Sequence, residues 1–184
     1  LDYCTEELVR LEGGFLCFRP PPEAPEPDEP PSQKTGRVTF GCFNNLAKIT
    51  PEMISLWARL MQSVPGSRMM FKTHGLAAQS ARSALMRRFE AHGIAGDRIE
   101  PLSYEWTFEA HLARYSEIDI GLDVFPYNGT TTTCEALWMG VPVVTLAGKS
   151  HVARVGASIL HHVGLPELIA SGMDDYLERA RALA

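Results

Sequence analysis

The residue types most suited to chemistry stand together in one short run, Gly129, Thr130, Thr131, Thr132 and Thr133. A glycine lets the backbone approach a ligand, and hydroxyls and free N–H groups at a helix N-terminus favour anions. The run therefore predicts an anion site, best suited to a diphosphate. The alternative is helix capping, which is a common role for one threonine but not for four in succession.

Two charged residues would complete such a site. Lys48 offers a point charge that holds a phosphate and offsets the charge on a departing nucleoside diphosphate, which makes it the candidate catalytic residue. Glu135 follows the threonine run within the same predicted helix, where a carboxylate accepts hydrogen bonds from ribose hydroxyls. Taken alone, each has a simpler interpretation, as an exposed lysine and as a solvated surface acid.

His111 and Arg114 lie on another predicted helix and are weaker candidates for a nucleotide pocket. His111 suits contact with a base or ribose, although a lone histidine on a half-apolar helix is more often a packing residue. Arg114 has a salt bridge as its alternative role. The adjacent His161 and His162 lack the spacing of metal ligands, and we interpret them as structural.

These residues need a scaffold that brings distant loops together, and the pattern after Arg37 predicts one. Short β-rich runs alternate with amphipathic segments, which indicates βαβ units around a parallel sheet. The expected strands are Val38 to Phe43, Arg68 to Lys72, Arg98 to Leu102, Ile118 to Val124 and Val141 to Leu146. Right-handed crossovers then give an α/β fold, a Rossmann-like doubly wound parallel sheet that binds ligands beyond the carboxyl ends of its strands. Lys48 and the threonine run both occupy such positions.

Helical periodicity and capping signals predict the segments between the strands. Thr50 and Pro51 read as an N-cap followed by proline at the first helical position, which starts the first crossover helix. Further helices are expected at about 77–92, 107–115, 130–140, 151–162 and 174–183.

The first 36 residues have a different composition from the rest. Residues 19–32 (RPPPEAPEPDEPPS) contain more than half of the chain's 13 prolines, so we expect a linker without regular structure. A helix-like stretch at 6–11 and an apolar run at 14–18 precede it. We therefore divide the chain into an N-terminal segment with a Pro-rich linker at 1–36 and one domain at 37–184. A start without Met indicates a piece of a longer protein.

Composition and motifs exclude several classes of function. The net charge is −5, and the 17 basic residues are scattered among 22 acidic ones, so no nucleic-acid or membrane partner is expected. The sequence has no signal-peptide pattern and no apolar run of about 18 residues, which favours a cytoplasmic location. The four cysteines have no zinc or framework spacing, so we predict neither metal nor cofactor. The phosphate-loop, dinucleotide-binding and nucleophile-elbow motifs are missing, which argues against a P-loop enzyme, a dinucleotide oxidoreductase and a hydrolase. The sequence also lacks a D-x-D triplet, which disfavours the metal-dependent class of sugar transferases.

Three segments resemble the protein O-GlcNAc transferase/SPINDLY group. They are GCFNNLAKITP at 41–51, EIDIGLDVFPYNGTTTTCEALWMGVPVVTLAG at 117–148 and HVARVGASIL at 151–160, and the similarity extends in order over 37–184. In that family tetratricopeptide repeats precede a two-lobed GT-B catalytic region. The resemblance implies that this chain is the C-terminal, nucleotide-sugar-binding lobe.

The resemblance also implies roles for individual residues. It makes Lys48 a diphosphate contact with Asn45 beside it, and it places His111 and Arg114 in the nucleotide pocket. Thr131 and Thr132 become phosphate contacts, and Glu135 becomes the ribose ligand. Animal members carry Gln, His and Asp where this chain has Asn45, Thr130 and Glu135. The form TTTTCE is more similar to the SPINDLY branch, whose plant members use GDP-fucose.

From these observations we expect an inverting, metal-independent protein O-glycosyltransferase that transfers GlcNAc from UDP-GlcNAc to Ser or Thr hydroxyls. The expected partners are the nucleotide-sugar donor, the acceptor protein, and the N-terminal lobe and repeats of the parent chain. The catalytic base would lie outside this chain, which would be inactive alone. Transfer of fucose from GDP-fucose or of another sugar, and a non-catalytic nucleotide-binding module, are the alternatives.

Overall fold

The computed structural model of this protein describes residues 5–7, 9 and 13–184, and its centre is a six-stranded sheet in the order β3-β2-β1-β4-β5-β6. All neighbouring strands pair in parallel. The strands are β1 (Thr39–Cys42), β2 (Arg68–Lys72), β3 (Ile99–Leu102), β4 (Ile120–Leu122), β5 (Val143–Leu146) and β6 (Ile169–Ala170). This order confirms the expected doubly wound sheet, whose direction of winding reverses between β1 and β4.

The helices between the strands begin and end close to the positions that their capping residues indicate. Thr50 Oγ1 accepts a hydrogen bond from the Met53 N–H and caps α2, and Thr107 caps α4 in the same way. The α-helices are α1 (Pro31–Thr35), α2 (Pro51–Ser63), α3 (Gln79–Glu90), α4 (Phe108–Ala113), α5 (Thr131–Trp138), α6 (Val155–His162) and α7 (Met173–Ala182). Short 3₁₀ turns are η1 (Leu46–Lys48), η2 (His74–Leu76), η3 (Gly96–Arg98), η4 (Arg114–Glu117), η5 (His151–Ala153) and η6 (Pro166–Leu168).

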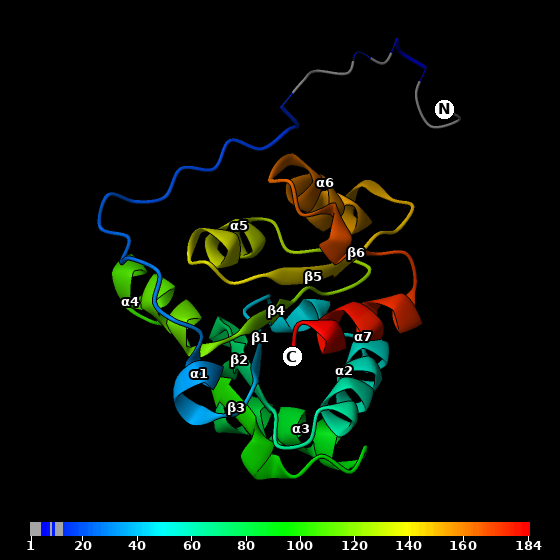
Figure 1. Ribbon diagram of the computed structural model, residues 1–184. Coiled ribbons are helices and arrows are strands. Elements are labelled where there is room, and N and C mark those ends of the chain that lie inside the picture. Colours follow the sequence, from blue (N-terminus) through cyan, green and yellow to red (C-terminus); the bar gives the residue numbers. More distant parts are fainter. Residues whose placement is uncertain (1–4, 8, 10–12) are drawn as a thin grey trace.

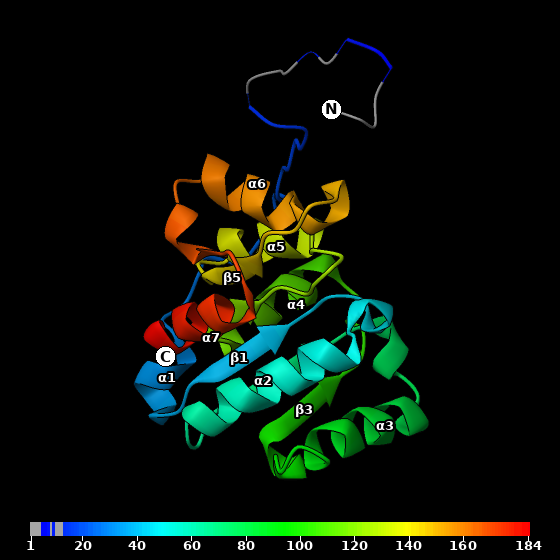
Figure 2. The same cartoon turned by 90° about the vertical axis from the view of Figure 1, so that its right-hand side faces the viewer.

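Two hydrophobic clusters hold helices on opposite faces of the sheet. One joins α2, α3 and α7 to the strands and includes the fully buried Trp57, Phe71 and Tyr176. The other lies under α4 and α5 and includes Leu112 and Met139. Figures 1 and 2 show this layered arrangement, with α2 and α3 side by side and α5 and α6 at the end of the sheet that contains β5. The sheet is thus fixed from both sides, and its carboxyl edge is left for loops.

Residues 19–38, which precede the sheet, combine an irregular stretch with one short helix. Residues 19–30 form no helix or strand, as expected, but α1 begins at Pro31, inside the stretch predicted to be irregular. Proline at the first helical position suits a helix start, which explains the difference. The Asp119 carboxylate accepts hydrogen bonds from the N–H groups of Ser32 and Thr39, at 2.9 and 2.7 Å. The expected stretch at 6–11 includes residues outside those described, and the division at residue 36 stays a prediction.

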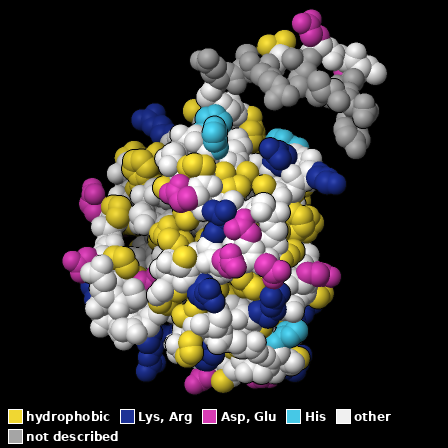
Figure 3. Space-filling model, turned by 45° about the vertical axis from the view of Figure 1, so that its right-hand side comes forward, with side chains coloured by type: hydrophobic (Ala, Val, Ile, Leu, Met, Phe, Trp, Pro, Cys, Tyr) yellow, Lys and Arg dark blue, Asp and Glu magenta, His cyan; other side chains and the backbone are white. Residues whose placement is uncertain are grey.

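The described surface is mixed in charge. On the face drawn in Figure 3, basic and acidic side chains are interspersed over the domain. Within 5–7, 9 and 13–184, each helix is too short or too polar to cross a membrane.

Candidate functional site

Lys48 reaches across the reversal point of the sheet to the loop that precedes α5. It ends η1, after β1, and its Nζ donates a hydrogen bond to the Asn128 carbonyl oxygen at 3.0 Å, although 80 residues separate the two. The ammonium also lies 4.0 Å from the centre of the Tyr127 ring, within the range of a cation–π contact. Partial burial lowers the pKa of Lys48, and the nearby Asp123 carboxylate opposes that shift. Lys48 therefore contacts the loop that leads into the threonine run, at Tyr127 and Asn128. Its convergence with the threonines on one diphosphate stays a prediction.

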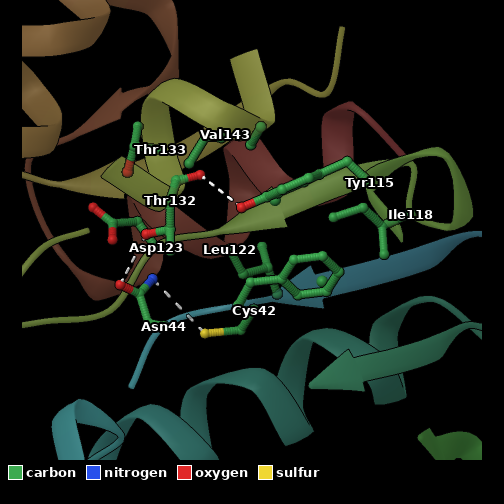
Figure 4. Close-up of a pocket in the computed structure, with 13 residues that line it drawn as sticks. Cys42, Asn44, Tyr115, Ile118, Leu122, Asp123, Thr132, Thr133 and Val143 are labelled. Atoms are coloured by element: carbon green, nitrogen blue, oxygen red, sulfur yellow. Dashed lines mark hydrogen bonds between the residues drawn. The ribbon is translucent and has the colours of Figure 1, made fainter. Parts of the chain in front are cut away.

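The neighbouring asparagines shape this loop in different ways. Asn45 accepts a hydrogen bond from the Ala47 N–H at 2.9 Å and so caps η1, the turn that ends in Lys48. Its side chain thus stabilises the turn that carries the lysine. Asn44, which the sequence did not single out as a candidate, is buried and receives a hydrogen bond from the Thr132 hydroxyl at 3.2 Å. Figure 4 shows Asn44 between Cys42 and Thr132.

The threonine run forms the start of α5. Thr130 precedes the helix and makes no side-chain capping bond, so capping does not account for this residue. The N–H groups of the first helical turn have no carbonyl partner within a helix, and the positive end of the helix dipole lies there. Thr131 is exposed, Thr130 and Thr132 are half-buried, and Thr133 is buried. The start of α5 therefore combines first-turn N–H donors with the exposed Thr131 side chain.

Gly129 is required by crowding. A Cβ at this position would lie 2.7 Å from Thr132 Oγ1, 2.8 Å from Thr133 Oγ1 and 3.0 Å from Asn44 Oδ1. The Gly129 N–H donates to the Asp123 carboxylate at 2.7 Å, which ties the loop to the end of β4. A side chain at position 129 would push the loop away from the threonine hydroxyls and from the Asp123 carboxylate.

Asp123 is a buried anchor for this loop. Its carboxylate also accepts hydrogen bonds from the Val124 N–H at 2.8 Å and from the Thr145 hydroxyl at 2.6 Å. Burial raises the pKa of Asp123 to about 6, although these hydrogen bonds and Lys48 favour the ionised form. Beside it, a cavity of about 20 Å³ lies between β1, β4 and α5 (Figure 4). That volume suits about one water molecule and is too small for a nucleotide. A ligand of nucleotide size would therefore lie outside the cavity, against the loops.

Glu135 is buried, not a solvated surface acid. Only 3% of the residue is exposed, and its Oε2 lies 2.9 Å from His111 Nε2 and 3.0 Å from the Tyr115 hydroxyl. The Tyr115 hydroxyl also lies 3.2 Å from the Thr132 carbonyl oxygen, so the cluster adjoins the threonine run. Burial and Glu135 raise the pKa of Tyr115 well above its usual value, which keeps the phenol as a hydrogen-bond donor. His111 and Glu135, both expected at the nucleotide pocket, are therefore in contact.

Arg114 is drawn into ion pairs. Its guanidinium lies 2.7 Å from Glu105 and 2.9 Å from Glu117, and the hydrogen bond to Glu105 raises the pKa of Arg114 further. These contacts correspond to the salt-bridge alternative. Across the described ranges, His, Cys, Asp and Glu side chains form no group of three or more suited to a metal ion.

The comparisons with known proteins agree with this geometry. Residues 33–184 match the profile of glycosyl transferase family 41. The chain belongs to this family. It is 46% identical over 98% of its length to the probable UDP-N-acetylglucosamine–peptide N-acetylglucosaminyltransferase SPINDLY of Solanum lycopersicum, of which it spans 19%. The SPINDLY protein of Arabidopsis thaliana is also 46% identical, with 98% of this chain and 20% of that protein covered.

Solved structures place the fold within the same group. A mutant of Thermobaculum terrenum O-GlcNAc transferase superposes with a TM-score of 0.90 at 42% identity, covering 97% of this chain and 33% of that one. A trehalose-phosphate synthase from Burkholderia vietnamiensis matches at a TM-score of 0.55 and 17% identity, covering 82% and 38%, and shares the fold alone. The family 41 chain thus has the Rossmann-like architecture of a GT-B lobe, as expected.

Sequence reasoning missed four residues of this candidate site: Asn44, Lys72, Tyr115 and Asp123. Lys72 ends β2, is buried, and contacts His111 Nδ1 through its Nζ. Asn44 directly follows the expected strand at 38–43, so the rule that ligand-site residues follow strands points to it. Asp123 was missed because the strand expected at 118–124 contains it, whereas β4 ends at Leu122. Tyr115 lies on η4, and no sequence signal distinguishes it from a packing aromatic.

Proposed function

We propose that this chain is the donor-binding lobe of a protein O-glycosyltransferase. The enzyme would transfer N-acetylglucosamine from UDP-GlcNAc to Ser or Thr hydroxyls, with inversion and without a metal ion. The observation that carries the proposal is the hydrogen bond from Lys48 Nζ to the Asn128 carbonyl oxygen, which holds a cation beside the N-terminal end of α5. The printed names of the SPINDLY relatives support the donor and the peptide acceptor.

In this mechanism the acceptor hydroxyl attacks the anomeric carbon from the face opposite the diphosphate. A bond forms between that carbon and the acceptor oxygen, the bond to the diphosphate oxygen breaks, and the hydroxyl proton passes to a base outside this chain. Negative charge grows on the departing diphosphate. Lys48 and the first-turn N–H groups of α5 stabilise that charge more in the transition state than in the ground state.

The nucleoside half of the donor would be held by the buried cluster around Glu135. Its carboxylate receives its hydrogen bonds from His111 and Tyr115 at one oxygen, Oε2. The other oxygen, Oε1, is the acceptor for ribose hydroxyls. Because His111 is held by Glu135 and Lys72, its ring nitrogens are engaged and it would meet the nucleoside through the face or edge of its ring.

The remaining parts of the enzyme would come from the parent protein. The chain spans 19% of the tomato SPINDLY protein and 33% of the Thermobaculum enzyme. The acceptor-side lobe, the catalytic base and any tetratricopeptide repeats would lie in that remainder, in a cytoplasmic parent protein. The chain alone would bind donor without turnover.

Calorimetry tests the donor directly, with UDP, UDP-GlcNAc, GDP and GDP-fucose titrated into the chain. We expect binding of the uridine nucleotides and its loss in Lys48→Ala, whereas Lys34→Ala, at an exposed lysine on α1, binds as the unmodified chain does. Clear binding of GDP without UDP would reverse the donor assignment. In the full-length protein, transfer should continue in EDTA, and a product of retained configuration would refute inversion.

A further inference from the structure

Lys72 is an unusual lysine because it is buried at the carboxyl end of β2. Only 3% of the residue is exposed, and its Nζ contacts His111 Nδ1 and lies 5.2 Å from the centre of the Phe43 ring. Burying an ammonium is costly unless it is paired. Burial lowers the pKa of Lys72 to about 8, while Glu105 and Glu135 oppose this shift and Arg114 adds to it. At neutral pH the group is therefore still mainly an ammonium.

An ammonium fixes the protonation of the histidine that it contacts. Its nitrogen has only N–H donors, so His111 Nδ1 must be the acceptor and carries no proton. The proton of the neutral ring is then on Nε2, which lies 2.9 Å from Glu135 Oε2 and donates to it. The opposite tautomer would place two acceptors, Nε2 and the carboxylate, against each other.

We infer that Lys72 is a positioning residue, which locks His111 as the Nε2–H tautomer and so holds the Glu135 carboxylate for the ribose of the donor. This inference rests on the proposed function and extends the site to β2. Hydrogen bonds from His111 and Tyr115 to Oε2 leave Oε1 to accept from the ribose. Lys72 acts through His111, as the outer partners of a ligating histidine act through the ring.

The first test is a measurement without ligand. The chain has its own sheet and two hydrophobic clusters, so ¹⁵N-histidine NMR is done on the isolated chain, with His111→Asn to assign one of its six histidines. The expected spectrum shows a protonated Nε2 and a bare Nδ1 for His111. Lys72→Met should let His111 Nδ1 take up a proton while Glu135 keeps the proton on Nε2, so that part of the ring is doubly protonated. Lys72→Arg should restore the bare Nδ1, and Lys34→Met should change nothing.

The second test uses the ribose, which UDP and GDP share. Each nucleotide and its 2′,3′-dideoxy form are titrated into the chain and into Lys72→Met. We expect the preference for the ribose form to fall by about tenfold in Lys72→Met, the effect of one charge-assisted hydrogen bond. Denaturation of Lys72→Met is measured first, because removing one partner of a buried polar contact costs stability, and the titrations are done where the variant is folded.

The outcomes separate this inference from the proposed function. If His111 Nδ1 stays bare in a folded Lys72→Met, or if the preference for ribose is unchanged, the inference is wrong even where UDP binds well. If neither UDP nor GDP binds the unmodified chain, the donor proposal fails, and the role of Lys72 in orienting Glu135 for ribose fails with it. A protonated Nδ1 in Lys72→Met together with a reduced ribose preference supports both steps.

Discussion

The role proposed for Lys48 depends on its position in the folded structure and not on the residues next to it in the sequence. The ammonium meets the loop before α5 through one carbonyl oxygen, 3.0 Å away and 80 residues later in the chain. A cation at that point lies where the helix dipole and first-turn N–H groups already favour an anion. The lysine therefore adds a full positive charge to the partial positive charge at the N-terminal end of α5.

Replacing Lys48 tests the chemistry at this point. Lys48→Ala in the full-length enzyme should lower turnover on the order of 10²-fold or more, as loss of one preorganised contact to a developing oxyanion does. Initial rates measured at saturating donor decide it. The unfolding midpoint should barely move, because a half-exposed lysine contributes little to stability. Unchanged turnover in a correctly folded variant would remove Lys48 from the mechanism.

The burial of Asp123 predicts how the stability of the folded protein depends on pH. Burial raises its folded pKa from 3.8 to about 6, so between these values the folded protein holds a proton that the unfolded chain has lost. The contribution of Asp123 to stability is therefore largest near pH 4 and declines as the pH rises through 6. Relative to Asp123→Asn, the free energy of unfolding should fall on the order of 3 kcal/mol over this range, at about 1.4 kcal/mol per pKa unit. Urea titrations from pH 4 to 7 measure it, and a flat or rising difference would contradict the burial argument.

The residues that sequence reasoning found and missed differ in a physical way. Lys48 and the threonine run were predictable because loops at the carboxyl ends of parallel strands meet. The burial of Glu135 was not, because it depends on His111 and Tyr115, which lie on α4 and η4. Lys72 was missed because a lysine at a strand end resembles an ordinary solvated charge.

At the scale of elements, α5 depends on the tight loop before it. Gly129→Ala would bring a methyl group within 2.8 Å of two threonine hydroxyl oxygens, so the loop must shift. We expect a loss of about 1–3 kcal/mol in stability, as overpacking costs, together with weaker UDP binding. Gly172→Ala is the matched control, because a Cβ there meets nothing within 4 Å. Denaturation measures the stability of both variants, and calorimetry measures their UDP binding. Equal stability and equal UDP affinity of the two variants would mean that the loop tolerates a side chain.

Most elements were predictable from periodicity, and the exceptions have local causes. The five expected strands are present, and β2 has the predicted bounds. The strand β6 was missed because its two residues are too few to show a period. The helix expected from 151 is divided into η5 and α6 at Arg154, which adopts φ −125° and ψ −1°, outside the helical region.

At the scale of the molecule, the last helix supports the site from behind. The Tyr176 hydroxyl on α7 donates to the Asp123 carbonyl oxygen at 2.9 Å and accepts a hydrogen bond from Trp57 Nε1 at 3.3 Å. Both partners are buried. The end of the chain thus holds the strand end that anchors the threonine loop.

Removing this hydroxyl tests that support. Tyr176→Phe leaves a buried carbonyl and a buried indole N–H without their partner, which should cost about 1–3 kcal/mol of stability. Chemical denaturation of the variant measures the loss. Tyr104→Phe is the control, because Tyr104 is 46% exposed. Equal stability of the two variants would show that α7 is held by apolar packing alone.

The reversal of the sheet also divides the chain into two pieces that share the site. One piece contains β1, β2 and β3 with Lys48, and the other contains β4, β5 and β6 with α5. They meet where β1 pairs with β4 and where α7 packs on α2. A cut in the loop at 103–107, where Trp106 is 92% exposed, would spare every strand. In the proposed function the diphosphate would then bridge two separate polypeptides, and bound nucleotide would favour their reassembly.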